Sequence, residues 1–201
     1  MNIGVLALQG AFIEHIAILT KMGVKTSQVR LPKHLEGLDG LIIPGGESTT
    51  IAKLAYSYGL MEPLKKFALK KPVWGVCAGM IFMAKNIGSD QPTLNLMDIV
   101  VKRNAFGRQI DSFMTDIQIS VFSNGDKKPF KSIFIRAPRL IETKGNARII
   151  ATLPKGEPVA AQEGHWLVTS FHPELTSDTR FHEFFLETVL ITSQKVRVIV
   201  S

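Results

Sequence analysis

Residues 72–82 read PVWGVCAGMIF, and they contain the one cysteine of the 201-residue chain, Cys77. The apolar residues before the cysteine are typical of a short buried strand, and those after it are typical of a helix. Glycines stand two positions before and two positions after Cys77. The stretch therefore predicts a sharp strand-to-helix turn with a thiol at its tip.

The pattern of residues 75–79 matches the G-x-nucleophile-x-G elbow, with cysteine in the place that serine takes in lipases. The backbone at such a nucleophile is strained, and larger residues at 75 and 79 would collide with the strand or the helix. Unpaired N–H groups at the start of the helix favour a thiolate, and the N–H of Ala78 is a candidate oxyanion-hole donor. A lone cysteine is otherwise a small buried apolar residue, so a thiol nucleophile also requires a base.

Short apolar runs alternate with helical patterns in the first half of the chain, and strand-like runs dominate from about residue 97. The strand-like runs are residues 3–8, 39–43, 72–76, 97–103, 112–122, 132–136, 147–153, 157–163 and 165–171. Helical periodicity places Phe12, Ile16 and Leu19 on one face of an early helix. In the last helix it places Phe181, Phe184, Phe185 and Val189 on one face. This order predicts an α/β fold with a parallel sheet and a β-rich extension, in a single domain over residues 1–201.

The net charge is +7, from 24 Lys and Arg against 17 Asp and Glu. The positive residues are scattered rather than gathered with aromatic residues, so we expect no nucleic-acid binding. A solvated surface or a docking face for an acidic protein fits better. The first residues lack a basic region, and their apolar run is too short for a membrane span. We expect a soluble, cytoplasmic protein that does not associate with a membrane.

A candidate base lies in VTSFHPELT, residues 168–176. His172 follows a predicted strand, and Pro173 favours extended backbone there. Because residues i and i+2 of an extended chain project to one side, Glu174 would point with His172 and orient its imidazole. Taken alone, the motif is a surface turn with solvated charges. Together with the cysteine elbow, it predicts a Cys-His-Glu triad.

The other four histidines carry no functional prediction. We expect His15 on the first helix, His34 in a polar loop, His165 in a turn and His182 on the exposed side of the last helix. None of them has the spacing of a zinc site, so no metal site is expected.

The loop IIPGGEST, residues 42–49, lacks the lysine of a phosphate-binding loop. Its glycines allow close approach to a substrate, and an N–H near Gly46 is a second candidate oxyanion-hole donor. A tight turn with positive φ explains the same glycines, and the two interpretations are compatible. Arginines 103, 108, 136 and 139 stand at predicted strand ends, and spacing alone does not decide which of them faces a site.

These motifs together resemble the class I, triad-type glutamine amidotransferases. The resemblance covers nearly the whole chain and is most specific to the glutaminase subunits of two-component pyridoxal 5′-phosphate synthases. It is carried by IGVLALQGA, LIIPGGESTT, CAGMI, VVKRNAFGRQIDSF, FIRAPRL and SFHPELT. It implies a three-layer, flavodoxin-like sandwich around a central, mostly parallel sheet.

The resemblance also implies roles for individual residues. Cys77 would attack the side-chain amide of L-glutamine, with His172 as base and acid and Glu174 as its orienter. The oxyanion hole would use Gly46 and Ala78, and Gln9 would lie near the site and the subunit contact. The implied substrate-binding residues are Gly46, Glu47, Ser48, Arg103, Ile135 and Arg136.

The implied reaction releases glutamate and ammonia through a γ-glutamyl thioester. The ammonia would pass to a separate (β/α)₈-barrel synthase subunit that builds pyridoxal 5′-phosphate, and this chain would hold no cofactor and need no metal. Three alternatives remain at this point: a glutaminase that feeds another synthase, a non-catalytic scaffold or redox-sensing thiol protein on the same fold, and a cysteine α/β-hydrolase. The hydrolase fits least, because its acid usually precedes the histidine by many residues.

Overall fold

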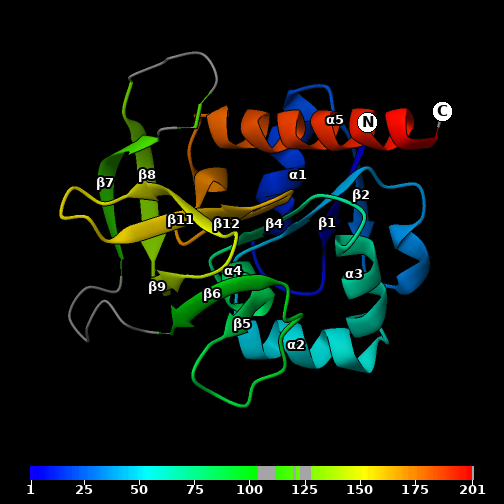
Figure 1. Cartoon of the computed structure of the whole chain (residues 1–201), viewed down its shortest axis with the longest axis horizontal. Coiled ribbons are helices and arrows are strands. Elements are labelled where there is room, and N and C mark those ends of the chain that lie inside the picture. The colour runs from blue at the N-terminus through cyan, green and yellow to red at the C-terminus, as the bar shows by residue number, and fades with distance from the viewer. Residues whose placement is uncertain (104–111, 120, 123–127, 201) are drawn as a thin grey trace.

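The computed structural model of the chain describes residues 1–103, 112–119, 121–122 and 128–200. Its centre is a nine-stranded sheet in the order β2-β1-β3-β4-β12-β11-β10-β7-β8, with helices on both faces (Figure 1). The strands of this sheet are β1 (Asn2–Leu6), β2 (Lys25–Val29), β3 (Gly40–Ile43), β4 (Val73–Val76), β7 (Ser112–Ile119), β8 (Phe130–Ile135), β10 (Arg148–Thr152), β11 (Pro158–Glu163) and β12 (Trp166–Thr169). A smaller sheet contains β5 (Ala84–Asn86), β6 (Met97–Lys102) and β9 (Arg139–Thr143).

The large sheet is parallel in one half and antiparallel in the other. Strands β2, β1, β3, β4 and β12 pair with one another in parallel. Strands β11, β10, β7 and β8 continue the sheet with antiparallel pairing. The predicted α/β fold with a central, largely parallel sheet is confirmed, and the β-rich second half of the chain forms the antiparallel extension.

Two helical layers cover the sheet. Helices α1 (Phe12–Lys21) and α5 (Arg180–Val200) lie on one face (Figure 1). Helices α2 (Ser48–Ser57), α3 (Met61–Ala68) and α4 (Ala78–Met83) and the smaller sheet lie on the other. Two short 3-10 helices, η1 (Pro32–Leu35) and η2 (Pro173–Leu175), lie in connections.

Alternation along the central strands explains why they read as continuous apolar runs. In β3, Leu41 and Ile43 face the core under α2 and α4, whereas Ile42 faces the core under α1 and α5. In β4, Val73 faces the first core and Trp74 the second. A strand covered on both faces needs apolar residues at every position, as parallel strands usually do. The burial of β3 and β4 therefore fixes where their carboxyl ends, and the loops that follow them, emerge.

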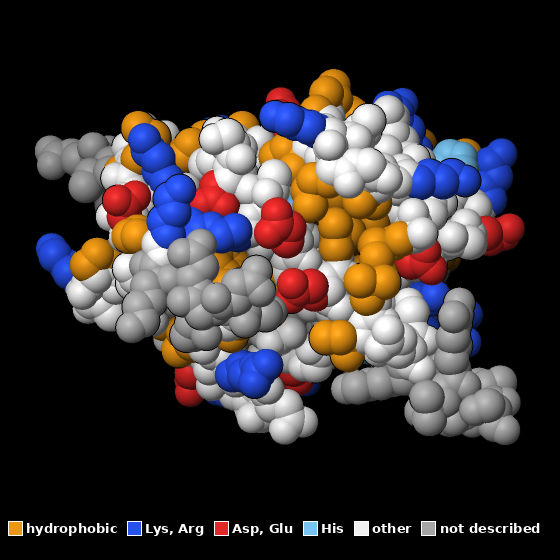
Figure 2. All heavy atoms as spheres, turned by 90° about the horizontal axis from the view of Figure 1, so that it is seen from above, with side chains coloured by type: hydrophobic (Ala, Val, Ile, Leu, Met, Phe, Trp, Pro, Cys, Tyr) orange, Lys and Arg blue, Asp and Glu red, His pale blue; other side chains and the backbone are white. Residues whose placement is uncertain are grey.

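The charged side chains are dispersed on the face that carries α5. Figure 2 shows Lys and Arg in several separate places there, with acidic and apolar side chains between them. Leu190 and Ile191 of α5 are about half exposed on the molecule. Among the described residues, none of the helices has the length and apolar composition needed to cross a bilayer.

Three strands were not predicted, and one histidine was placed wrongly. Strands β2, β5 and β9 lack a long apolar run, and β2 forms an edge of the large sheet with a half-exposed pattern. The predicted exposure of His182 is wrong, because its side chain is fully buried between α5 and the sheet. The burial arises because His182, Phe185 and Val189 share a helical face at spacings of three and four residues.

Candidate active site

Cys77 lies at the tip of the turn between β4 and α4, as the elbow pattern predicts. Its backbone has φ 50° and ψ −101°, outside the regions that non-glycine residues normally occupy. The N–H of Cys77 donates to the carbonyl oxygen of Thr169 at the end of β12, at 2.7 Å. Its carbonyl oxygen accepts from the N–H of Met80 in the first turn of α4. The neighbouring strand and the new helix together hold the strained turn in place.

The two glycines of the elbow are required by their surroundings. A Cβ at Gly79 would stand 2.2 Å from the carbonyl oxygen of Ile43, and a Cβ at Gly75 would stand 2.6 Å from the carbonyl oxygen of Gly79. These contacts are far too short for any side chain. The glycines thus let β3, β4 and α4 approach closely enough to form the elbow.

His172 reaches the elbow from the neighbouring strand. Strand β12 pairs in parallel with β4, so the chain leaves both strands at the same edge of the sheet. The N–H of His172 donates to the carbonyl oxygen of Ile133 in β8, at 2.8 Å. The chain therefore turns at His172 and places its imidazole beside Cys77, near enough for the thiol to raise the pKa of the imidazole.

Glu174 binds the other side of the same imidazole. The Nδ1 atom of His172 lies 2.7 Å from the Oε1 atom of Glu174, which leaves Nε2 to face Cys77. The predicted extended chain through Glu174 is wrong, because residues 173–175 form the 3-10 helix η2. The carboxylate reaches His172 from this turn, and both side chains are buried.

The electrostatics favour a proton on His172. Burial lowers the pKa of the imidazole, but hydrogen bonds to Cys77 and Glu174 and the negative charges of these groups outweigh it and raise the pKa to about 10. Burial raises the pKa of Glu174, but the nearby His15 and the hydrogen bond from His172 hold that pKa below its usual value. At neutral pH the pair is therefore an imidazolium beside a carboxylate.

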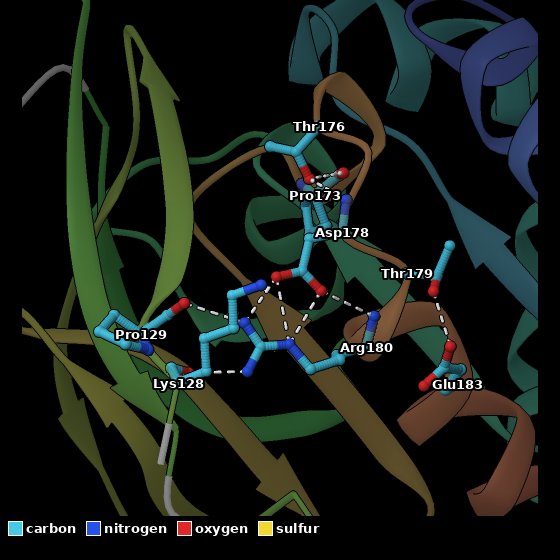
Figure 3. A network of polar contacts seen from close by, with 8 residues as sticks. All are labelled: Lys128, Pro129, Pro173, Thr176, Asp178, Thr179, Arg180 and Glu183. Carbon is cyan, nitrogen blue, oxygen red and sulfur yellow. Dashed lines mark hydrogen bonds and ion pairs between the residues drawn. The ribbon is translucent and has the colours of Figure 1, made fainter. Parts of the chain in front are cut away.

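A hydrogen-bonded network fixes the segment that carries η2 (Figure 3). Arg180 pairs with Asp178 at 2.6 Å and donates to the carbonyl oxygens of Lys128 and Pro129 ahead of β8. Thr176 donates its hydroxyl to the carbonyl oxygen of Pro173 at 3.0 Å. The start of α5, η2 and the start of β8 are thus bound together, which restricts movement of His172 and Glu174.

A pocket of about 290 Å³ opens beside the thiol. This is the lower end of the range for small-molecule sites and suits one small metabolite. The lining residues are Gln9, Gly46, Glu47, Ser48, Cys77, Ala78, Ile81, Arg103, Ile135, Arg136, Pro138 and His172. The N–H of Ala78, the first residue of α4, has no acceptor within its own helix, so it is available to an oxygen atom in the pocket.

Charged and polar side chains form one wall of the pocket. Glu47 caps α2 by accepting from the N–H of Thr50 at 2.7 Å, and its other oxygen lies 3.2 Å from Arg103. Burial raises the pKa of Glu47, but hydrogen bonds from Thr49 and Thr50 outweigh it and lower the pKa to about 2. Gln91 accepts from Arg103 at 2.9 Å and from the hydroxyl of Ser48 at 3.2 Å. The wall therefore offers a fixed carboxylate and a fixed guanidinium side by side.

The Gly46 loop is held from the end of β1. The side-chain oxygen of Gln9 accepts from the N–H of Glu47 at 2.7 Å, and the N–H of Ala11 donates to the carbonyl oxygen of Gly45 at 3.0 Å. Gly46 has φ +159°, and a Cβ there would stand 2.4 Å from the side-chain oxygen of Gln9. Close approach to Gln9 thus explains the glycine.

Every residue predicted for the site lies at this pocket or directly behind it. Glu174 is the one that does not line it, and it contacts the lining residue His172 instead. Arg136 lines the pocket with φ 42°, whereas Arg139 opens β9 outside it and Arg108 lies outside the described residues.

Sequence reasoning missed four residues around the site. Ile81 and Pro138 line the pocket, and Gln91 joins Ser48 to Arg103. His15 is fully buried with its Nε2 atom 3.6 Å from Glu174. The spacing of His15 and Leu19, i and i+4 on α1, was the available signal for that burial.

Comparison with known proteins shows which family the chain belongs to. Residues 5–191 match the model of the SNO glutamine amidotransferase family. The chain belongs to this family. A structure titled as a glutamine amidotransferase superposes with a TM-score of 0.87 at 43% identity, covering 93% of this chain and 98% of the other.

Several curated relatives of this glutamine amidotransferase are named pyridoxal 5′-phosphate synthase subunit PdxT. The one from Herpetosiphon aurantiacus is 52% identical over 191 residues, covering 92% of this chain and 99% of the relative. The one from Pelotomaculum thermopropionicum is 49% identical over 200 residues, covering 98% of this chain and all of the relative. The predicted family is therefore confirmed over nearly the full length.

Proposed function

We propose that the chain hydrolyses L-glutamine as the glutaminase subunit of a pyridoxal 5′-phosphate synthase, with Cys77, His172 and Glu174 as its triad. The observation that carries the assignment of residues is that Cys77 and His172 line one small polar pocket, with the imidazole of His172 hydrogen-bonded on its other side to Glu174. A single domain over residues 1–201 accords with the sheet, whose strands come from both halves of the chain.

The first half-reaction acylates Cys77. A protonated His172 beside the sulfur favours the thiolate, which attacks the side-chain carbonyl carbon of glutamine. The carbonyl oxygen gains negative charge and is stabilised by the backbone N–H groups of Gly46 and Ala78. When the C–N bond breaks, His172 transfers its proton to the leaving nitrogen, so ammonia departs and a γ-glutamyl thioester remains.

The second half-reaction restores the enzyme. The neutral His172 now accepts a proton from water, whose oxygen attacks the thioester carbon. The C–S bond breaks, glutamate leaves, and the proton on His172 again stabilises the thiolate. Glu174 keeps the imidazole in the tautomer and orientation that both steps need.

The polar wall supplies the contacts for the amino-acid end of glutamine. The guanidinium of Arg103 suits the α-carboxylate, and the ionised Glu47 suits the α-ammonium group. Ser48 offers a hydroxyl, and Ile135 and Arg136 also line the pocket. This pairing of opposite charges explains selection of an α-amino acid over a simple amide.

The released ammonia passes to a separate (β/α)₈-barrel synthase subunit, which joins it to a pentose phosphate and a triose phosphate. We place the reaction in the cytoplasm, where a catalytic thiol stays reduced. Gln9 also lines the pocket, and we infer that the partner subunit docks near it.

The deciding experiment measures glutamine hydrolysis by the complex with the synthase subunit. Cys77→Ala is expected to abolish ammonia release while thermal unfolding stays close to the wild type. Treatment with a diazo-ketone analogue of glutamine is expected to add one label to Cys77 in the wild type, and excess glutamine should prevent it. Undiminished turnover by Cys77→Ala, or a label elsewhere, would overturn the proposed triad. Co-purification with the synthase subunit of a different pathway would overturn the proposed partner.

A further inference from the structure

A series of buried polar groups continues behind the triad, beyond Glu174. The Nε2 atom of His15 lies 3.6 Å from the Oε2 atom of Glu174. The Nδ1 atom of His15 lies 3.0 Å from the Nε2 atom of His182. All three side chains are buried, and they come from α1, η2 and α5.

His15 and Glu174 each have an unpaired polar atom that faces the other residue. The Nε2 atom of His15 and the Oε2 atom of Glu174 are both shielded from solvent and have no hydrogen-bond partner within the described residues. Buried polar atoms in folded proteins nearly always have a partner, so two such atoms that face each other need an explanation. A hydrogen bond of a catalytic site is often long in the free protein and shortens in the working complex.

We propose that His15 is a positioning residue, whose Nε2–H donates to Glu174 and thereby fixes the carboxylate that orients His172. The proposal rests on the proposed glutaminase function. The Oε1 atom of Glu174 then accepts from His172 and the Oε2 atom accepts from His15, so both oxygens of one carboxylate are held.

The tautomers follow from the contacts. Glu174 is ionised, so a bare nitrogen of His15 facing it would be repelled, and His15 must carry its proton on Nε2. Burial lowers the pKa of His15, more than the charge of Glu174 raises it, so the ring holds one proton and its Nδ1 atom is an acceptor. His182 must then donate from its own Nε2–H to the Nδ1 atom of His15, which fixes the second ring as well.

Trp74 supports both rings from the sheet. Its ring lies edge-on to His15 and to His182, with ring centroids 5.5 Å and 5.0 Å away. Trp74 donates its own N–H to the hydroxyl of Thr169 and is fully buried. It lies three residues before Cys77 on β4, so one aromatic side chain links the histidine pair to the strand that carries the nucleophile.

The charged groups that face His15 are few. Glu174 and His172 face it from the segment after β12, His182 faces it from α5, and Glu14 precedes it on its own helix. Within the part of the chain that the structure describes, only Glu174 lies close to the Nε2 atom of His15. The effect of His15 on the reaction therefore passes through the ionisation and the orientation of Glu174.

The test compares two variants at His15 in the complex with the synthase subunit. His15→Leu removes the donor and is expected to lower kcat about tenfold to a hundredfold, with KM for glutamine unchanged. Without the donor the ionised form of Glu174 is less stable, so its pKa rises and the acidic limb of the pH–rate profile moves to higher pH. His15→Gln places an amide N–H near the former Nε2 position and is expected to restore most of kcat and the original limb.

The matched control is His165→Leu. His165 also binds a single acceptor, the carbonyl oxygen of Ala68 at 2.8 Å, but it lies at the far end of β12 from the site. This variant is expected to retain wild-type kcat. Equal losses in His15→Leu and His15→Gln, or a loss without any shift of the acidic limb, would overturn the positioning role.

A measurement on the wild-type chain keeps the proposal testable if the variants do not fold. Nitrogen-15 NMR of the imidazoles is expected to show His15 protonated on Nε2 and unprotonated on Nδ1. Protonation on Nδ1 would overturn the proposal, whatever the activity. If the wild-type complex did not hydrolyse glutamine, the proposed function would be contradicted instead. Failure of the proposed role of His15 and failure of the proposed function are therefore distinguishable.

Discussion

Gly79, the second residue of α4, lies so close to the end of β3 that a Cβ at this position would stand 2.2 Å from the carbonyl oxygen of Ile43. The backbone oxygen cannot move aside as a flexible side chain could. The elbow that carries Cys77 therefore depends on the absence of a single methyl group.

Gly79→Ala is accordingly expected to destabilise the chain by about 3 kcal/mol or more, because an overpacked position must shift backbone. Glutaminase activity should fall by more than the loss of folded protein alone would cause, because a shift of α4 also moves the turn that carries Cys77. Urea unfolding and ammonia release by the complex measure the two effects. The control is Gly164→Ala, because Gly164 has φ +59° and open space around the position of a Cβ atom. This substitution should lower the free energy of unfolding by about 1–2 kcal/mol and leave activity unchanged. Full activity in Gly79→Ala would contradict this account of the elbow.

The His172 imidazole should titrate far above the ordinary range. Its folded-state pKa of about 10 exceeds the ordinary 6.5, so its protonation stabilises the fold fully below about pH 6.5. This stabilisation is lost as the pH rises through 10. An NMR titration of the ring should show no midpoint near neutrality. In Cys77→Ala the midpoint should move down, because the hydrogen bond to the thiol is the largest cause that raises the pKa. A wild-type midpoint near 6.5 would contradict the buried ion pair.

Arg103 should act on substrate binding rather than on chemistry. Its two terminal nitrogens contact Gln91 and Glu47, a geometry that the single ammonium of lysine cannot reproduce. Arg103→Lys is expected to raise KM for glutamine about tenfold, with kcat little changed. Arg148→Lys is the control, because Arg148 contacts only Gln162 among the pairs described and lies outside the pocket. A fall in kcat at constant KM would show that Arg103 serves the reaction itself.

Gln9 should support the oxyanion hole indirectly. Gln9→Ala removes the acceptor of the Glu47 N–H and one of the contacts that hold the Gly46 loop. This hydrogen bond contributes about 1 kcal/mol, so its loss is expected to lower kcat/KM about fivefold in the complex. Gln28→Ala, which removes an exposed contact to Arg30 on the edge strand β2, should leave kcat/KM unchanged.

The isolated chain should hydrolyse glutamine slowly. The Gly46 loop is bonded to the turn between β1 and α1, and Ile13 on that turn's helix is 64% exposed. A partner docked there would reset the loop, and one oxyanion-hole donor typically contributes about 100-fold in kcat. Rates measured with and without the synthase subunit test this expectation. Equal rates would show that the hole is complete in the free chain.

The central strands and the strand-to-helix turn at Cys77 could be predicted from the sequence because both depend on local patterns. The runs at 39–43 and 72–76 are apolar throughout, and each ends at a glycine or cysteine turn. Strand β2, KTSQV, was missed because an edge strand pairs through its backbone and needs no apolar run. The triad was predicted as a set of residue types, but the 3-10 turn that carries Glu174 is held at its start by the hydrogen bond from His172 to Ile133 of β8, a strand well separated from it in the sequence.

The two buried histidines show most clearly what a local sequence pattern cannot predict. His15 and His182 are separated by 167 residues, and neither neighbourhood contains a motif. Helical spacing indicates that each of them is buried, but the contact between the two rings results from the packing of α1 and α5 on the same face of the sheet, which no local pattern describes. Gln91 was missed for the same reason, because its contacts join α2 to the end of β6.

The pairing of β4 with β12 has a consequence for how this protein evolves. The chain reaches Cys77 and His172 from two adjacent, buried strands, whereas the surface that we propose for the second subunit lies on the turn between β1 and α1. Mutations that redesign the docking rim thus need not disturb the sulfur or the imidazole. Substitutions at the surface alone could therefore adapt the same glutaminase site to a different ammonia-consuming partner.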